Sequence, residues 1–273
     1  MSRKTRQSVA IHYERFGESG PFAVLVQGLG LSGSFWFDVP GRVAAAGFRV
    51  LVPDNRGTGR SDAPRGGYTM AQLADDLAGV LDDAGADRAF VCGISMGGMI
   101  TQNFALRHPR RAAGLVLMAT TPGKPHGRPP PAASLARLLT IPLLRRRGAK
   151  NLVKLLLPPS QWANAPVLLR EFGSAMRAEP TRPSTFVSHL AAIQGHRAGE
   201  RLGEVGCPVH VMTGDEDALV RPENSRLLAK LIRGATLEVV PGVGHAMMAL
   251  DPDAPLRGLA AVRARAEERR QEA

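Results

Sequence analysis

The sequence is poor in cysteine and in aromatic residues. Only two of its 273 residues are cysteine, and Phe, Trp and Tyr together make up 5% of the chain. Cys92 and Cys207 each lie in or beside an apolar run, and neither belongs to a Cys-x-x-Cys pair or a histidine cluster. This pattern predicts two buried thiols and argues against a disulfide framework or a metal site.

Long apolar runs are also missing. No stretch approaches the roughly 18 consecutive apolar residues that a membrane-spanning helix needs. The charged N-terminus, MSRKTRQSVA, leads into no apolar segment of the kind found in secretory signals. We therefore expect a cytoplasmic protein without stable membrane insertion. With 44% apolar residues, a chain of this length can bury one large core.

Acidic residues are scarce in one part of the chain. Overall, 35 Lys and Arg residues stand against 24 Asp and Glu residues, for a formal net charge of +11. Between Lys124 and Arg197 there are 12 basic residues and only two acids, Glu171 and Glu179, so this segment carries +10 of the total. So local an excess argues against nucleic acid as a partner. Its arginines either solvate helices or meet an anionic substrate, an acidic carrier protein or a membrane surface.

Short apolar runs alternate with helical patterns along most of the chain. Several runs, such as AVLV, RVLVP and GLVLMA, are apolar without alternation, which is typical of strands covered on both faces of a parallel sheet. We therefore predict a doubly wound, mostly parallel α/β sheet, with the first run as an antiparallel edge strand. The expected strands are Val9–Tyr13, Ala23–Gln27, Phe48–Pro53, Ala89–Cys92, Gly114–Ala119, Pro208–Thr213 and Thr236–Val240, and the expected helices are Met70–Ala84, Gly97–His108, Pro222–Leu231 and Asp253–Arg269.

One interval breaks this alternation. From Gly123 to about Arg197 there is no clear strand, and leucine-rich basic stretches such as LARLLTIPLLRRR and NLVKLLLPP occur. A structureless loop of this length is implausible in a compact domain, so we predict a helical insertion that prolines divide into short helices. The predicted organisation is an α/β core of residues 1–122 and 198–273, with residues 123–197 as a helical cap.

The strongest motif is Gly93-Ile94-Ser95-Met96-Gly97-Gly98, which follows the expected strand AFVC and opens an expected helix. A Gly-x-Ser-x-Gly pattern in this strand–turn–helix context is typical of a nucleophile elbow. The serine of such an elbow sits at a strained backbone corner, so its neighbours must be small. The N-terminus of the following helix favours a developing negative charge. Ser95 is therefore the predicted nucleophile.

Together with three further motifs, this elbow resembles the α/β-hydrolase superfamily, in its branch of small capped serine esterases, enol-lactonases and cofactor-free haloperoxidase-like proteins. The motifs are Gln27-Gly28-Leu29-Gly30, Asp54-Asn55-Arg56-Gly57-Thr58-Gly59-Arg60-Ser61 and Gly242-Val243-Gly244-His245. The resemblance implies a core sheet with a lid inserted after the sixth strand, where the basic segment falls. It also implies a catalytic triad in the chain order Ser, Asp, His.

His245 and Asp217 complete the predicted triad. His245 follows a strand in a Gly-x-Gly-His loop, which is where the family keeps its base. Three carboxylates compete just past the strand PVHVMT, and the family pattern Gly-x-x-Asp selects Asp217, with Asp215 as the alternative. The acid would hold the imidazole tautomer and stabilise the imidazolium. The remaining histidines are interpreted as structural: His12, His108, His126, His189, His196 and His210.

The resemblance also implies an oxyanion hole made of two backbone N–H groups, those of Leu29 and Met96. Gln27 stands where the family commonly has histidine. Whether Gln27 braces the loop or reaches the substrate stays open, and we keep it with Gly28 as a candidate substrate-binding pair. The Asp54–Ser61 motif is interpreted as a structural loop.

A serine nucleophile predicts an acyl-enzyme, formed without a metal or cofactor. The expected substrate is a carboxylic ester, lactone or related acyl compound of a hydrophobic small molecule. Leucines of the cap, among them Leu135, Leu138 and Leu139, are expected to share an inward face above Ser95, with Arg145–Arg147 outside.

Two alternatives from other classes stay open. One is a non-hydrolytic enzyme on the same triad, such as an acyltransferase, a perhydrolase or haloperoxidase-like enzyme, or a C–C lyase, with a thioesterase acting on carrier-bound acyl groups beside it. The other is a binding protein on a hydrolase scaffold, which would not need an intact Ser, Asp and His set.

Overall fold

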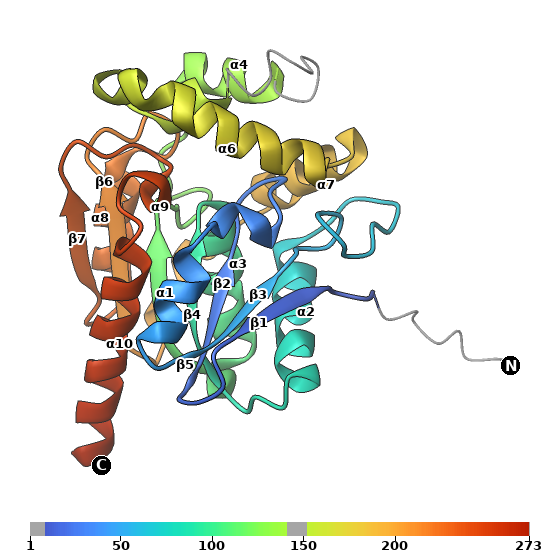
Figure 1. Ribbon diagram of the computed structural model, residues 1–273. Coiled ribbons are helices and arrows are strands. Elements are labelled where there is room, and N and C mark those ends of the chain that lie inside the picture. The colour runs from blue at the N-terminus through green and yellow to red at the C-terminus, as the bar shows by residue number, and fades with distance from the viewer. Residues whose placement is uncertain (1–8, 141–151, 273) are drawn as a thin grey trace, which may run out of the picture.

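A seven-stranded sheet forms the centre of the computed structural model, which describes residues 9–140 and 152–272. The strand order is β1-β3-β2-β4-β5-β6-β7, with β1 antiparallel to β3 and every other pair parallel. The strands are β1 (Tyr13–Phe16), β2 (Phe22–Val26), β3 (Arg49–Pro53), β4 (Ala89–Ile94), β5 (Ala112–Met118), β6 (Val209–Gly214) and β7 (Thr236–Val240). The predicted fold class, an α/β sheet that is mostly parallel, is confirmed (Figure 1).

The edge strand β1 begins later than predicted. The sequence favoured Val9–Tyr13, but in the structure only Tyr13 belongs to the strand. The preceding backbone pairs with a loop instead, because the His12 carbonyl accepts a hydrogen bond from the Asp54 amide at 2.9 Å and the His12 amide donates to Ser61 Oγ at 2.9 Å. The predicted antiparallel edge position is confirmed.

Helices cover both faces of the sheet (Figure 1). The inner strands are accordingly apolar on both sides. One face carries α1 (Val39–Ala45) and α10 (Ala254–Gln271); the other carries α2 (Met70–Asp83), α3 (Met96–Arg107) and α8 (Pro222–Leu231). Shorter elements are α9 (Met247–Leu250), η1 (Gly33–Trp36), η2 (Pro109–Arg111) and η5 (Gly199–Glu204). Helix α1 lies in a stretch where the sequence pattern gave no helix.

A group of helices between β5 and β6 lies above the carboxyl ends of the strands (Figure 1). The insertion therefore follows the fifth strand of this sheet and not the sixth, which the resemblance implied. It contains α4 (Ala132–Thr140), helical turns over 152–156, η4 (Pro159–Asn164), α6 (Ala165–Ala178) and α7 (Pro183–Gln194). We call this helical insertion the cap. Its ends meet in an antiparallel bridge between Gly123 and Arg197.

The cap helices differ from the prediction in two ways. Helices α6 and α7 have 14 and 12 residues and are not cut short by proline, because Pro166 and Pro183 occupy first turns, where a missing N–H costs no hydrogen bond. Leu135 and Leu139 are 37% and 48% exposed, so the predicted inward face of α4 is wrong for both. Arg145–Arg147 lie outside the described residues.

Within the described residues, no helix is both long enough and apolar enough to cross a membrane. Both cysteines are free thiols: Cys92 is buried in β4, whereas Cys207 is partly buried ahead of β6. Burial raises the pKa of the Cys207 thiol to about 11, which keeps it protonated and unreactive at neutral pH.

Candidate active site

Ser95 occupies a strained corner between β4 and α3. Its φ of 57° lies in the left-handed region, which is costly for a residue other than glycine. The close approach of neighbouring chains explains the glycines beside it: a Cβ on Gly97 would overlap the Val26 carbonyl, and a Cβ on Gly93 would overlap the Gly97 carbonyl. The Ser95 amide donates to the Met118 carbonyl at 2.9 Å. The elbow geometry is thus built from backbone contacts between adjacent strands.

His245 and Asp217 come together in the loops after β7 and β6. His245 Nδ1 and Asp217 Oδ2 are 2.7 Å apart, and the two side chains are 5% and 0% exposed. Asp217 Oδ1 accepts hydrogen bonds from the Leu219 and Val220 amides, both at 2.8 Å. Since both carboxylate oxygens are satisfied, the acid is held in one orientation and can fix the imidazole.

The neighbouring carboxylates have other partners. Asp215 is exposed and accepts from the Gly242 amide at 2.7 Å, and Glu216 lies 3.3 Å from Ser160 Oγ. Neither bonds His245. The structure therefore brings Asp217, the residue that the Gly-x-x-Asp pattern favoured, to the imidazole. Asp215 lies two residues earlier in the same turn and contacts the Gly242 amide.

Ser95 and His245 line the same cavity. The hydrogen bonds among the described residues do not include one between Ser95 Oγ and His245, a contact that often tightens only when substrate binds. Thr120 and Thr121 follow the end of β5. Thr120 Oγ1 donates to the Ser95 carbonyl at 2.7 Å, so this residue braces the elbow.

Leu29 lines the same cavity as Ser95, and Met96 follows the serine in the chain. The amides of both residues have no hydrogen-bond partner among the described residues. Gly28 packs beside Ser95, because a Cβ on this glycine would lie 3.4 Å from the serine Cβ. Gln27 is fully buried, and its Oε1 accepts a hydrogen bond from the Gly28 amide at 3.1 Å. This contact braces the loop. Gln27 also lines the cavity, and its Nε2 is buried without a partner among the residues that the structure describes.

The cavity has a volume of about 930 Å³ and lies between the cap and the carboxyl ends of the strands. Its lining is largely apolar and includes Phe35, Leu138, Leu152, Leu156, Phe172 and Met176. The rings of Phe35 and Phe172 pack with centroids 5.5 Å apart, so η1 of the core contacts α6 of the cap. Arg128, Arg177 and Glu179 are charged residues on the wall. A mostly apolar enclosure of this size suits a hydrophobic small molecule.

Two polar side chains at this cavity were not found from the sequence. Asn224, at the start of α8, is fully buried and fixes the cap by accepting from the Arg128 amide at 2.7 Å and donating to the Arg128 carbonyl at 3.0 Å. Thr121 Oγ1 donates to Asn224 Oδ1 at 3.0 Å. Pro222, two positions before Asn224, signalled a helix start. No local sequence pattern reveals hydrogen-bond partners that lie about a hundred positions away.

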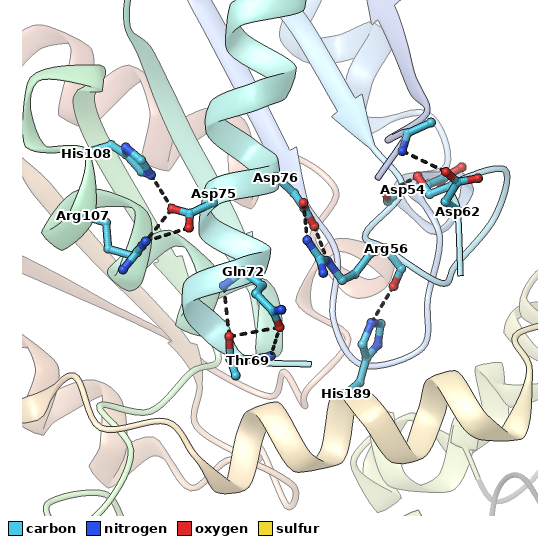
Figure 2. A network of polar contacts seen from close by, with 12 residues as sticks. Asp54, Arg56, Asp62, Thr69, Gln72, Asp75, Asp76, Arg107, His108 and His189 are labelled. Atoms are coloured by element: carbon cyan, nitrogen blue, oxygen red, sulfur yellow. Dashed lines mark hydrogen bonds and ion pairs between the residues drawn. The ribbon is translucent and has the colours of Figure 1, made fainter. Parts of the chain in front are cut away.

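The loop after β3 is a structural loop, as interpreted from the sequence. Asp54 accepts from the Gly33 amide at 2.7 Å and the Arg60 amide at 2.9 Å, and burial raises the pKa of its carboxyl. Arg56 pairs with Asp76 of α2 in a two-point contact (Figure 2). These bonds fix the loop to η1 and to α2.

Most of the remaining histidines have structural partners. His108 Nε2 bonds Asp75 at 2.8 Å (Figure 2), and His210 Nδ1 bonds Thr236 at 2.7 Å. His189 and His196 are fully buried or nearly so, and burial lowers the pKa of each to about 4. His126 is exposed at the start of the cap.

Comparison with known proteins places the chain in a family. The model of the α/β hydrolase fold family matches residues 24–252. A Variovorax paradoxus protein named "Putative carbamate hydrolase RutD" is 32% identical over 240 residues, covering 86% of this chain and 89% of that protein. A protein of the same name from Caulobacter sp. is 33% identical over 237 residues, covering 85% and 86%.

Solved structures of hydrolases are similar to this chain over nearly its whole length. The enol-lactonase from Burkholderia xenovorans superposes with a TM-score of 0.81 at 27% identity, over 94% of this chain and 97% of that one. A thermophilic esterase from Thermogutta terrifontis gives a TM-score of 0.78 at 28% identity, over 97% and 95%. The chain belongs to the α/β-hydrolase fold family and is a hydrolase.

Proposed function

We propose that the protein is a serine hydrolase that cleaves a carboxylic ester, a lactone or a related acyl bond of a hydrophobic small molecule through an acyl-enzyme on Ser95. The observation that carries the proposal is the buried 2.7 Å contact between Asp217 and His245, together with the cavity that His245 and Ser95 both line. A nucleophile, a base and an orienting acid in this order are the parts that acyl transfer needs.

In the proposed reaction, Ser95 Oγ attacks the acyl carbon and gives its proton to His245 Nε2. Asp217 keeps the Nδ1–H of the imidazole directed at its own carboxylate and stabilises the imidazolium. The amides of Leu29 and Met96 donate to the oxyanion as it forms. His245 then protonates the leaving oxygen, and water enters and repeats the sequence, with the serine as the leaving group.

The cavity supports a substrate larger than the scissile group. Aliphatic and aromatic side chains make up most of the lining of a space of about 930 Å³, which a hydrophobic acyl or ring system fills better than a small polar ester. Relatives named as carbamate hydrolases suggest a second candidate class, since a carbamate carbonyl is open to the same attack. The size and apolar lining of the cavity favour the ester or lactone.

A panel of p-nitrophenyl esters of graded acyl length, with a matched set of aryl carbamates, tests the proposal. We expect a preference for medium or long acyl chains and covalent labelling of Ser95 by a fluorophosphonate. Adding alcohol or peroxide acceptors measures how the acyl-enzyme divides between water and other nucleophiles, which separates a hydrolase from an acyltransferase or perhydrolase. Absence of turnover on every ester and carbamate, together with unlabelled Ser95, would contradict the proposal.

A further inference from the structure

Helix α7 of the cap carries a buried histidine that joins two loops of the core. His189 is fully buried, and its Nδ1 accepts a hydrogen bond from the Gly30 amide at 3.2 Å. Its Nε2–H donates to the carbonyl of Arg56 at 3.0 Å (Figure 2). A neutral imidazole has one donor and one acceptor nitrogen, so these two partners use both and define the tautomer.

Gly30 is held by the cap a second time. Thr181, in the segment between α6 and α7, donates from Oγ1 to the Gly30 carbonyl at 2.6 Å. On the other side of the loop, the Gly28 amide is taken by Gln27 Oε1. Leu29 therefore lies between two residues whose backbone groups are bonded, while its own N–H has no partner within residues 9–140 and 152–272 and can donate to a ligand.

Arg56, the second partner of His189, is itself held by a largely buried ion pair. The Arg56 guanidinium reaches Asp76 of α2 through Nε at 2.6 Å and Nη2 at 2.5 Å, and the two side chains are only 9% and 14% exposed. The guanidinium also lies over the Tyr68 ring, 5.6 Å from its centroid. Figure 2 shows the continuous line of contacts from Asp76 through Arg56 to His189.

We infer that His189 is a positioning residue of the oxyanion hole, which fixes Gly30 from the cap and thereby sets the direction of the Leu29 N–H, with Thr181 as a second hold. Catalytic donors must be pre-oriented within a fraction of an ångström of the productive position, so a shift of this loop weakens stabilisation of the transition state more than substrate binding. The inference rests on the function proposed above. It gives the cap a part in the rate of acyl transfer besides shaping the cavity.

The protonation state of His189 agrees with this role. Burial lowers the pKa of the imidazole to about 4. At neutral pH the ring is therefore uncharged, and its Nδ1 lone pair is free to accept the Gly30 N–H.

Two substitutions of similar polarity test the two hydrogen bonds of His189 one at a time. His189→Asn places a carbonyl oxygen near the position of Nδ1 and keeps the acceptor for Gly30, whereas His189→Gln places its amide near Nε2 and keeps only the contact with Arg56. We expect His189→Gln to lower kcat about tenfold or more with KM changed by less than about threefold. His189→Asn should recover most of the loss, and Thr181→Val should show a smaller loss of the same kind.

Ser188→Ala is the matched control. Ser188 lies next to His189 on α7, and its Oγ bonds the carbonyls of Gly66 and Ser184 and not Gly30. It should leave kcat unchanged. Circular dichroism and thermal melts establish that each variant is folded.

A trifluoromethyl ketone, which forms an oxyanion on Ser95, gives the second readout. Its affinity should fall in parallel with kcat across the His189 and Thr181 variants, because both depend on the hole. An unchanged kcat in folded His189→Gln, a loss confined to KM, or Asn no better than Gln would overturn the inference. Failure of the proposed function is distinct from these results, since it shows as an inactive wild-type protein whose Ser95 resists labelling.

Discussion

The loops of the core and the helices of the cap contribute to the cavity in different ways. Core residues that could act on a substrate, Ser95, Asp217 and His245, follow β4, β6 and β7 and are fixed by strand ends and backbone hydrogen bonds. The cap contributes mainly apolar side chains from separate helices, such as Leu138 on α4 and Phe172 on α6. On the function proposed above, the sheet sets what reaction can occur and the cap sets which molecule fits. His189 joins the two parts through its bonds to Gly30 and Arg56.

The largest effect should come from the core. Ser95→Ala removes the nucleophile, and we expect ester hydrolysis to fall by about 10⁴-fold or more while the fold is kept. Steady-state kinetics with a p-nitrophenyl ester measure this, and a fluorophosphonate should label the wild type at Ser95 alone. Substantial activity in the variant, or label on another serine, would contradict the assignment of Ser95 as the nucleophile.

The next effect distinguishes the two aspartates of one turn. Asp217→Asn leaves the imidazole without its charged partner, so we expect kcat to fall by about 10²-fold to 10⁴-fold. Asp215→Asn, on an exposed carboxylate that bonds only the Gly242 amide, should change kcat by less than about threefold. Equal losses of kcat in the two variants would show that the orienting role does not belong to Asp217.

An effect on stability should appear where the cap meets the core. His189 and His196 have pKa values lowered to about 4 by burial, against about 6.5 in an unfolded chain. Between these pH values the unfolded state binds more protons, so the free energy of unfolding falls as the pH drops from about 6.5 to about 4, by on the order of 1–3 kcal/mol for each histidine.

Urea unfolding at a series of pH values measures this loss. Replacing His196 by Gln removes one titrating group, so the slope of stability against pH should become shallower in the variant. A slope equal to that of the wild type would mean that His196 is not responsible.

The smallest effect should come from the cap wall. Leu138 lines the cavity from α4, whereas Leu135 on the same helix is 37% exposed. Leu138→Trp should lower kcat/KM for long acyl esters by about tenfold and spare short ones, because the larger ring fills space that the acyl chain needs. Leu135→Trp is the control and should leave the chain-length profile as it is. The same profile in both variants would show that α4 does not limit acyl length.

The parts of the site that the sequence predicted are those set by local backbone geometry. The elbow of Ser95 needs glycines within two positions, and the family pattern Gly-x-x-Asp singles out Asp217 among three neighbouring carboxylates. Packing of the cap depends on what lies opposite each helix. Periodicity placed Leu135, Leu138 and Leu139 on one face, but it could not show that the face is only partly covered. His189 was missed as a positioning residue because its partners are 159 and 133 residues away in the chain.

The bridge between Gly123 and Arg197 means that the cap leaves and re-enters the core at one point. The Lys124 amide bonds the His196 carbonyl at 3.1 Å beside it, so the two ends stay together whatever the segment between them contains. A loop closed at its base can change in length at a small cost in chain entropy, because that cost grows only with the logarithm of the number of residues. An ancestor could therefore exchange this excursion for another and acquire a new substrate range while the strands below it kept their register.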